Sequence, residues 1–557
     1  MSSAIEQARR LIDLAQSTLN SALSHLKAQS LDGGRVSGSK LDESQLACYE
    51  VAYCEAEITA AKVMLDYSQS VRQEKGAGSE LRIEERLALQ YSAEAIQNCR
   101  SRFNSRRADF GLSREQLGQS VDSDEADAFI NEFLSTASLE AVGKSVLEES
   151  GFTGEYMLDE EKEMMRDQFR NFATDVVMPL AEHIHTKDAD IPDEIIKPLV
   201  ELCCFGLSIP MQYGGIQPDD QEDNLGMIVV TEELSRGSLG AAGSLITRPE
   251  IMARALLKGG TEEQKQHWLP LLAQAEPLNA VAVTEPNFGS DVASMKLKAT
   301  QTEGGWILNG EKTWCTFAGK AGVLLTLART NPDPKSGHKG LTMFLVEKPS
   351  FPGHEFNHTQ EQGGTLTGKA IPTIGYRGMH SFTVFYDNYF VPDSHVLGGE
   401  EGIGNGFYYT MAGFAGGRIQ TAARATGVMQ AAFERAMDYA QERVVFGKPI
   451  ADYQLTLVKL ARMAMMLAVS RQFTYHVARL MDEGKGQMEA SLVKLYSCKS
   501  SEWLCREAMQ IHGGMGYAEE SAVSRYFIDS RVLSIFEGAE ETLALKVIAK
   551  ALVDAAQ

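Results

Sequence analysis

The chain has 557 residues, of which 44% are hydrophobic and 23% are charged, as is usual for a globular protein. A chain of this length exceeds what one hydrophobic core supports, so we expect roughly three or four domains. Lys and Arg number 53 and Asp and Glu number 75, which gives a formal net charge of −22. This charge argues against a general nucleic-acid or anionic-membrane surface, because phosphates are met by clustered basic residues.

The cysteine and hydropathy patterns exclude several further classes. The 8 cysteines include no C-x-x-C pair, so neither a zinc site nor a disulfide framework is indicated. Most of them lie in apolar helical patterns, which predicts buried thiols in a reducing compartment. No apolar run is long enough to span a bilayer, and the N-terminus lacks the apolar segment of a signal peptide. We therefore expect a cytoplasmic protein that binds no metal.

The first 118 residues or so carry helical patterns of apolar residues. The amphipathic stripes run over residues 5–26, 46–71 and 81–103. The second stripe is predicted to end at the Gly-containing break 75–78, and the polar, acidic stretch 118–127 is predicted to be a linker.

The late part of the chain has a similar order of long helices, over residues 418–516 with a Gly-rich break at 483–486. Two interpretations of this similarity stay open. Either the N-terminal region is a degenerate copy of the C-terminal bundle, or two unrelated helical bundles simply look this alike.

Between these regions the pattern changes from helix to strand and back. Residues 155–275 are mostly helical, with a Pro- and Gly-marked turn at 209–215. Period-two patterns then predict strands near residues 281–284, 306–313, 323–327, 341–346 and 382–386. The dipeptide Asn309-Gly310 predicts a hairpin turn.

The order helical, β, helical with little interleaving predicts an α+β fold and not a doubly wound sheet. We expect four domains, an N-terminal helical extension, a helical domain, a β domain and a C-terminal helical bundle: 1–150, 155–276, 277–397 and 398–557. The glycines of 402–406 have the wrong spacing for a dinucleotide site, so they are predicted to form a loop that enters a helix. His512 is predicted to be structural.

A single carboxylate near the C-terminus, Glu537, stands out as a candidate base. Its neighbours on one side are the apolar residues Val532, Leu533, Ile535 and Phe536. An apolar setting penalises the ionised form of a carboxylate and so makes it a stronger base. Gly538 has no side chain, so a flat group could approach the backbone there. The alternative is that Glu537 only complements the dipole of the following helix, a purpose that Glu540 and Glu541 already serve.

Further motifs join Glu537 in a fixed order: Val283-Thr284-Glu285-Pro286 with Gly289-Ser290-Asp291, Thr313-Trp314-Cys315-Thr316, and the segments 442–454 and 510–517. With these motifs the sequence resembles the acyl-CoA dehydrogenase family of FAD enzymes over about residues 155 to 555. The resemblance implies a helical domain, a central β-barrel-like domain and a C-terminal four-helix bundle. The extra N-terminal helical domain precedes them.

The resemblance also implies a reaction, in which hydrogens leave Cα and Cβ of an acyl-CoA thioester. Glu537 matches the family's base for the α-proton, and FAD accepts the hydride at flavin N5. Some members place the base before the Arg of the first C-terminal helix, but Gly417 precedes Arg418 here, so we assign the base to Glu537.

Family motifs assign the remaining contacts. The cofactor contacts are Val283, Thr284, Trp314, Thr316, Arg443, Phe446, Gln454, Gln510 and Gly514, and the substrate contacts include Ser290, Arg418 and Gly538. In the family several FAD contacts come from a neighbouring subunit, which implies a homodimer or a dimer of dimers. An electron-transfer flavoprotein is the implied electron acceptor.

The N-terminal extension and the segment Gly375-Tyr376-Arg377-Gly378-Met379-His380 resemble a branch of the family whose short, branched acyl-CoA carries a second, free carboxylate. Its pocket should contain a cation, and Arg pairs with carboxylates in a bidentate manner. Arg248 is predicted to end a helix that lines the acyl pocket and to meet this distal carboxylate. The alternative is a surface Arg at a helix C-terminus, favoured by the helix dipole.

Three other functions stay open: a dehydrogenase of another short-chain acyl-CoA, an acyl-CoA oxidase, and an alkylation-response flavoprotein that binds DNA. The last resembles the family with a basic C-terminal extension, whereas the extension here is N-terminal and the net charge is −22. We therefore expect an acyl-CoA substrate and neither a nucleic-acid nor a membrane partner.

Overall fold

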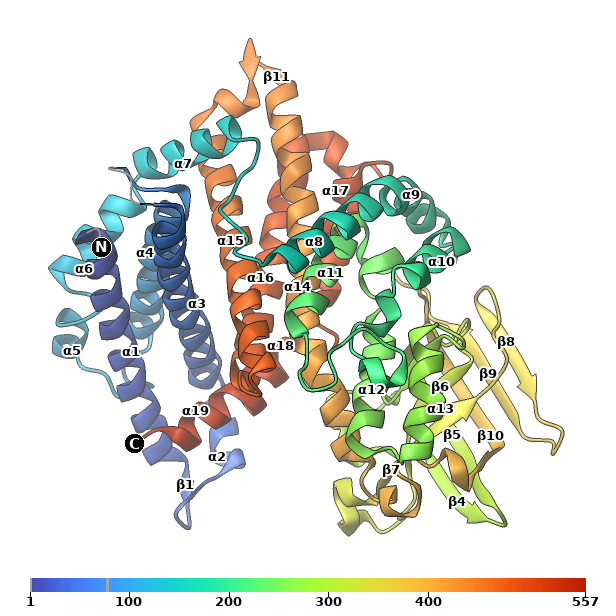
Figure 1. Ribbon diagram of the computed structural model, residues 1–557. Helices are drawn as coiled ribbons and strands as arrows, with labels where there is room; N and C mark the ends of the chain where they lie inside the picture. The colour runs from blue at the N-terminus through green and yellow to red at the C-terminus, as the bar shows by residue number, and fades with distance from the viewer. Residues whose placement is uncertain (1–2, 77–79) are drawn as a thin grey trace. The chain divides into compact units, whose positions relative to one another are not determined.

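The computed structural model describes residues 3–76 and 80–557. The chain divides into two compact units (Figure 1). One contains Met1–Glu161, Thr421–Leu480 and Gly484–Gln557, and the other contains Lys162–Gln420 and Met481–Glu483. The predicted division into four domains stays a prediction.

The first unit combines the N-terminal helices with the C-terminal bundle. The N-terminal elements are α1 (Ser3–Ser30), β1 (Leu31–Asp32), β2 (Arg35–Val36), α2 (Gly38–Asp42), α3 (Gln45–Lys75), α4 (Ile83–Ser105), α5 (Arg114–Gly118), α6 (Asp124–Phe133) and α7 (Thr136–Glu148). The C-terminal elements are α14 (Gly406–Glu442), which begins in the second unit, β11 (Val444–Val445), β12 (Lys448–Pro449), α15 (Gln454–Asp482), α16 (Gln487–His512), α17 (Ala522–Leu533), α18 (Glu540–Thr542) and α19 (Lys550–Ala555). A π-helical stretch, Leu543–Ala549, joins the last two helices.

Helix α3 is the central helix of this unit and packs against α1, α4 and α16, so the N-terminal helices lie beside the C-terminal ones (Figure 1). Its sequence is rich in Ala and apolar residues and lacks Gly and Pro, which suits a long buried helix. The predicted break at 75–78 agrees with the end of α3 at Lys75, whereas residues 77 and 78 lie outside the described residues.

The predicted linker at 118–127 is wrong. Val121 is buried, and Ser123 caps α6 by accepting a hydrogen bond from the backbone N–H of Ala126. The acidic residues Asp124 and Glu125 occupy the first turn of α6, where negative charge complements the helix dipole. The acidic composition therefore marks the start of a helix.

The second unit places helices against an eight-stranded sheet. Its helices are α8 (Glu160–Phe172), α9 (Met178–Lys187), α10 (Asp193–Glu201), α11 (Asn224–Gly237), α12 (Thr247–Gly259) and α13 (Glu262–Ala273). Its strands are β3 (Asn279–Ala282), β4 (Lys298–Thr302), β5 (Gly305–Thr316), β6 (Val323–Arg329), β7 (Leu341–Glu347), β8 (Glu355–Thr359), β9 (Thr365–Ala370) and β10 (Ser381–Pro392). The strand order is β3-β6-β4-β5-β10-β9-β8, with β7 paired to β6.

Strands β6 and β7 are buried on both faces, which explains their unbroken apolar sequences. Leu324 and Phe344 point into the interior of the curled sheet with Trp306 and Val384. Their neighbours Leu325, Met343 and Leu345 point to the opposite face and pack against Ile251, Met252, Trp268 and Leu269 of α12 and α13. The helical, β, helical order of an α+β fold is confirmed.

The hairpin predicted at Asn309-Gly310 is wrong, because both residues lie inside β5. The turn between β4 and β5 uses Gly304, at φ 71°. The register between β5 and β10 shifts between Tyr386 and Tyr389, and the backbone N–H of Asn388 donates to Oδ1 of Asn309 at 2.9 Å. The dipeptide therefore stands opposite a β-bulge.

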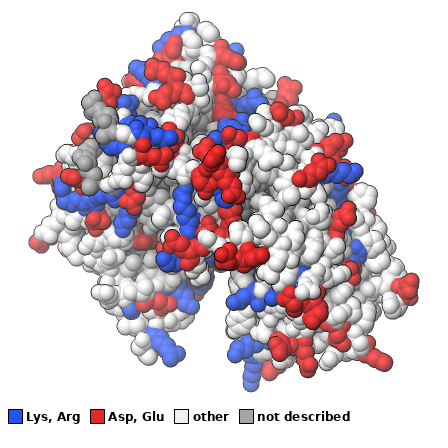
Figure 2. Space-filling view, viewed as in Figure 1, with Lys and Arg blue, Asp and Glu red and all other residues white. Residues whose placement is uncertain are grey.

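Three further structural observations bear on the sequence predictions. The glycines of 402–406 lead into α14, as predicted, and 7 of the 8 cysteines are buried. Acidic and basic side chains are interspersed on the face that Figure 2 draws. Among the described residues, no helix combines the length and the apolar character that crossing a membrane requires.

A polar cluster joins α3 to the segment after Glu537. Oη of Tyr53 donates to Oε1 of Glu540 at 2.7 Å, Tyr49 donates to the same oxygen, and Nζ of Lys499 lies 3.3 Å from it. Burial opposes ionisation of Glu540, but these hydrogen bonds and the Lys499 charge outweigh it, so the pKa of Glu540 is lowered. The cluster therefore stabilises the unit through the ionised form of Glu540.

We predict that Glu540→Gln lowers the free energy of unfolding at pH 7 by about 1 kcal/mol, because hydrogen bonds to a charged acceptor are the stronger ones. A lowered folded-state pKa gives stability that is present above the ordinary value of 4.5 and is lost as the pH falls through the folded-state value. The gap between wild type and variant should therefore close on acidification. Thermal unfolding from pH 7 to pH 3, with exposed Glu541→Gln as the control, measures this. A gap that does not change with pH would contradict it.

Candidate active site

Glu537 lies in the turn between α17 and α18, in the left-handed region at φ 53°. Its Oε1 accepts a hydrogen bond from Nη2 of Arg424 on α14 at 2.9 Å. The pair is buried, since the side chains of Arg424 and Glu537 are 0% and 7% exposed. The apolar surroundings expected from the sequence thus contain a cation.

Arg424 itself is fixed by further contacts. Its Nη2 also donates to Oγ1 of Thr421 at 2.6 Å, and its guanidinium carbon lies 4.7 Å from the centre of the Phe536 ring. A guanidinium stacked on an aromatic face and bonded to a carboxylate has little freedom to rotate. The position of Arg424 therefore fixes the position of the Glu537 carboxylate.

A second buried cation, Lys494 on α16, holds the backbone of the same turn. Its Nζ donates to the carbonyl oxygen of Gly538 at 2.7 Å and to that of Leu533 at 3.2 Å. Gly538 has φ 102°, and among the described residues no atom outside its immediate neighbours lies within 4 Å of the place where a Cβ would stand. The turn is thus anchored on both sides of Glu537, with open space beside Gly538.

In the second unit, the segment after β3 is held by a buried ion pair. Nζ of Lys312 donates to the carbonyl of Val283 at 2.8 Å and to Oε1 of Glu285 at 2.9 Å. The backbone N–H of Thr313 donates to the carbonyl of Thr284 at 2.8 Å. Burial, which outweighs the attraction of Glu285, lowers the pKa of Lys312. Val283 and Thr284 are therefore held rigidly at the end of β5.

The end of β5 presents a flat aromatic surface beside this segment. Trp314 has φ 56° and its side chain is 55% exposed. Thr316 is buried, and its Oγ1 lies 3.0 Å from Oγ of Ser381 on β10. An exposed indole next to fixed backbone and a hydroxyl group suits the planar ring of a flavin. The structure thus brings Val283, Thr284, Trp314 and Thr316 together.

The other predicted cofactor contacts lie at one end of the helical bundle in the first unit. Arg443 and Phe446 belong to the β11–β12 hairpin, Gln454 begins α15, and Gln510 and Gly514 lie at the end of α16. Phe446 is 95% exposed. From Arg424 to the end of α14 at Glu442 the helix rises about 27 Å, so this group is remote from Glu537 along the bundle.

Arg248 does not lie where the sequence suggested. It is in the first turn of α12, whereas the prediction placed it at the end of a helix, and it is only 8% exposed, which also excludes a surface Arg. Its Nη2 donates to Oη of Tyr376 at 3.3 Å. Pro249 is the signal that could have revealed the helix start, because Pro is tolerated in the first turn.

The remaining predicted substrate contacts belong to the second unit. Ser290 is exposed in the loop after β3, and Arg418 is half-buried on α14, where burial lowers its pKa. Sequence reasoning missed Arg424, Lys494 and Lys312. The available signal for Arg424 was a charged residue among the small and apolar residues that line the middle of α14.

Comparison with known proteins identifies the family whose members this chain resembles. Models of the acyl-CoA dehydrogenase N-terminal, middle and C-terminal domains match residues 159–276, 280–388 and 404–553. The chain is 38% identical to (2S)-methylsuccinyl-CoA dehydrogenase of Cereibacter sphaeroides over 558 residues, which cover 97% of this chain and 96% of that protein.

Solved structures match a shorter part of the chain. The glutaryl-coenzyme A dehydrogenase glutaryl-CoA complex is 30% identical with a TM-score of 0.64 and covers 71% of this chain and 96% of its own. A glutaryl-CoA dehydrogenase from Mycobacterium smegmatis in complex with FADH2 is 27% identical with a TM-score of 0.63, and covers 72% of this chain and 96% of its own.

We predict that Arg424→Met lowers the free energy of unfolding by about 3–5 kcal/mol, because it leaves the Glu537 carboxylate buried without this cation. The double variant Arg424→Met/Glu537→Gln should regain a large part of that loss. Unfolding of the two single variants and the double variant measures the coupling. Strictly additive losses would show that the two side chains do not interact.

Proposed function

The chain belongs to the acyl-CoA dehydrogenase family, and we propose that it oxidises (2S)-methylsuccinyl-CoA, a short branched acyl-CoA, to mesaconyl-CoA, a step of the ethylmalonyl-CoA pathway. The family consists of FAD-dependent oxidoreductases that act on CH–CH bonds, so FAD is the cofactor. An electron-transfer flavoprotein as acceptor and a cytoplasmic location are proposed with this assignment.

One observation carries the choice of substrate. The match to the methylsuccinyl-CoA enzyme extends over 97% of this chain and so includes the N-terminal helices, whereas the two solved dehydrogenases cover 71% and 72%. These helices lie in the same compact unit as Glu537 and bond to the segment that follows it through Glu540. A shared extension supports a shared substrate more strongly than the common dehydrogenase fold does.

We propose that Glu537 removes the α-proton. Arg424 holds the carboxylate in place through the hydrogen bond at 2.9 Å, and a charged partner offsets part of the cost of burying the carboxylate. The backbone N–H of Glu537 is proposed to stabilise the charge that develops on the thioester oxygen, with the open space beside Gly538 admitting the thioester. FAD, when bound, supplies the acceptor for the β-hydride.

The proposed flavin contacts are Val283, Thr284, Trp314 and Thr316, whose exposed indole and fixed backbone fit a planar ring. We propose that Arg443, Phe446, Gln454, Gln510 and Gly514 contact the pyrophosphate and adenine of an FAD held by a neighbouring subunit. The 95% exposure of Phe446 on a hairpin supports this, because a large apolar side chain gains by being covered. A homodimer or a dimer of dimers is proposed accordingly.

Arg248 is proposed to bind the distal carboxylate of the substrate, and Ser290 and Arg418 to contact the remainder of the acyl-CoA. Two features support the role of Arg248. It is buried, and it bonds to Tyr376, which belongs to the segment that points to the methylsuccinyl-CoA branch. A buried Arg beside a phenol presents a charge-assisted site for a carboxylate.

We predict that, in a panel of CoA thioesters, methylsuccinyl-CoA bleaches the flavin with a higher kcat/KM than butyryl-CoA or isovaleryl-CoA. Arg248→Ala should lower kcat/KM for methylsuccinyl-CoA by about 100-fold and leave the value for butyryl-CoA within a few-fold, because only the first loses a buried charge pair.

The flavin content of the variant serves as the folding control. Equal losses on both esters would remove the selective role of Arg248, and a preference for butyryl-CoA in the wild type would contradict the proposed substrate. Turnover with an artificial electron acceptor but not with air separates the dehydrogenase from an acyl-CoA oxidase.

A further inference from the structure

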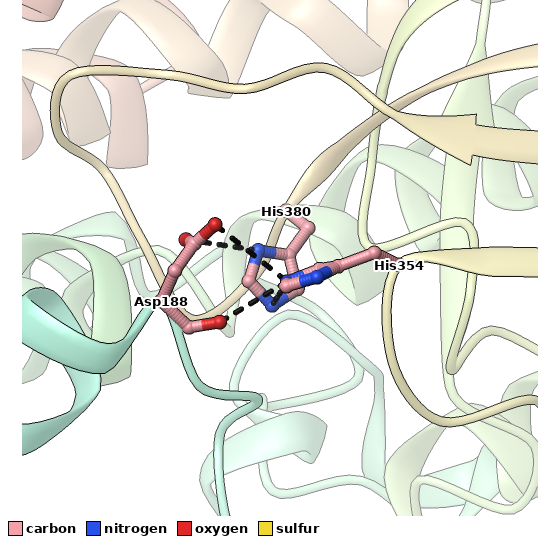
Figure 3. A group of neighbouring side chains, drawn as sticks. All are labelled: Asp188, His354 and His380. Atoms are coloured by element: carbon pink, nitrogen blue, oxygen red, sulfur yellow. Dashed lines mark hydrogen bonds and ion pairs between the residues drawn. The ribbon is translucent and has the colours of Figure 1, made fainter.

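A cluster of two imidazoles and a carboxylate lies in the second unit (Figure 3). Asp188 follows the last residue of α9, His354 directly precedes β8, and His380 directly precedes β10. Because these residues come from three distant segments, no spacing motif in the sequence reveals them. We call Asp188, His354 and His380 the α9 cluster.

The potential ligand atoms of the α9 cluster lie at the spacing of metal ligands. Nε2 of His354 lies 3.2 Å from Nε2 of His380 and 3.7 Å from Oδ2 of Asp188. Nδ1 of His380 lies 3.6 Å from Oδ1 of Asp188. Ligands bound to Zn²⁺ at about 2.0–2.2 Å in a tetrahedron are themselves roughly 3.3–3.6 Å apart. A metal ion can therefore join Nε2 of His354, the Asp188 carboxylate and one of the two ring nitrogens of His380 after small side-chain rotations.

A hydrogen bond between the two imidazoles also accounts for the 3.2 Å contact, since one ring nitrogen can donate and the other accept. Exposure favours the metal. The His354 side chain is 48% exposed, so a hydrogen bond between the two imidazoles contributes little free energy beyond the hydrogen bonds to water that it replaces. The same exposure gives a metal ion a path into the site and room for a water ligand.

The neighbouring charged groups and the chemical type of the ligand atoms indicate which metal ions the cluster can bind. Nε of Arg377 lies 3.6 Å from Oδ1 of Asp188. Asp190 places its Oδ1 3.1 Å from Nε2 of His380, and its other carboxylate oxygen accepts a hydrogen bond from the backbone N–H of Gly353 at 2.7 Å. Two of the three potential ligands in the cluster are imidazole nitrogens. Imidazole ligands suit Zn²⁺ and exclude Ca²⁺ and Mg²⁺, which prefer oxygen.

We propose that the α9 cluster binds a borderline divalent metal ion of the Zn²⁺ class through Nε2 of His354, one ring nitrogen of His380 and the carboxylate of Asp188. Oδ1 of Asp190 stands at the spacing of a fourth ligand beside His380. The proposal does not depend on the substrate assigned above.

Metal binding here would fasten the α9–α10 connection to the sheet. The α9–α10 connection is already joined to the segment before β10 by the hydrogen bond from the backbone N–H of Ile191 to the carbonyl of Gly378 at 3.3 Å. His380 is followed by Ser381, which bonds to Thr316 at the end of β5. An ion would therefore stiffen the strand ends that carry Thr316, and it would raise the midpoint of thermal unfolding by binding the folded state alone.

The test uses the FAD-loaded, full-length protein after treatment with a chelator, titrated with Zn²⁺ by calorimetry and by thermal unfolding. We expect one equivalent to bind and the unfolding midpoint to rise. His354→Ala, an exposed position that should not disturb folding, should weaken this binding by more than about 100-fold. His358→Ala is the matched control, since His358 lies on the adjoining β8 and packs against the ring of Tyr389.

Three results would overturn the proposal. They are the absence of a saturable equivalent in the wild type, unchanged Zn²⁺ binding in His354→Ala, and loss of binding in His358→Ala or in Cys203→Ser, which removes the exposed thiol. Loss in His354→Ala with retention in both controls would support it.

Discussion

The buried ion pair between Arg424 and Glu537 is the interaction on which the turn that contains Glu537 depends. Burying two charges costs free energy, and the cost is offset only when geometry and additional hydrogen bonds are good. Here the guanidinium also bonds to Thr421 and stacks on Phe536, and Lys494 holds the carbonyls on both sides of the turn. Glu537 can thus be held at φ 53°, a backbone conformation that costs a non-glycine residue energy.

The second unit also contains a buried ion pair, between Lys312 and Glu285, beside the predicted flavin contacts Val283 and Thr284. Lys312 is fully buried, and it donates hydrogen bonds to one backbone carbonyl and one carboxylate. These bonds fix the segment that contains Val283 and Thr284. Breaking such a buried pair leaves a charge without compensation, so both units can tolerate little movement at these positions. Rigid supports of this kind are what precise placement of reacting groups requires.

Much of the architecture follows from apolar periodicity. The stripes of α1, α3 and α4 and the apolar runs of β6 and β7 were readable because burial on one or both faces dictates their residues. Strands β4 and β8 are short and largely exposed, so their sequences carry no such pattern. The acidic stretch at 118–127 and Asn309-Gly310 misled because helix capping and a β-bulge use the same residues as linkers and hairpins.

Some residues of the candidate site could be suggested from the sequence, and others are revealed only by the structure. Glu537 and the residues of the ordered motifs could be proposed from the sequence because the family's chemistry fixes their types, and their roles stay predictions. Arg424, Lys494 and Lys312 could not, because their roles arise from contacts between segments far apart in the chain. Arg248 was assigned to the wrong end of a helix, since the Leu-Ile-Thr run before it continues the helical pattern through the irregular backbone ahead of α12.

The most direct test of the account is the rate of flavin reduction in Glu537→Gln. The FAD-loaded variant is mixed anaerobically with methylsuccinyl-CoA, and bleaching of the flavin is followed by rapid mixing. If Glu537 removes the α-proton, the variant should retain its FAD and reduce it at least about 1,000-fold more slowly than the wild type. An undiminished rate with any CoA ester would contradict the account.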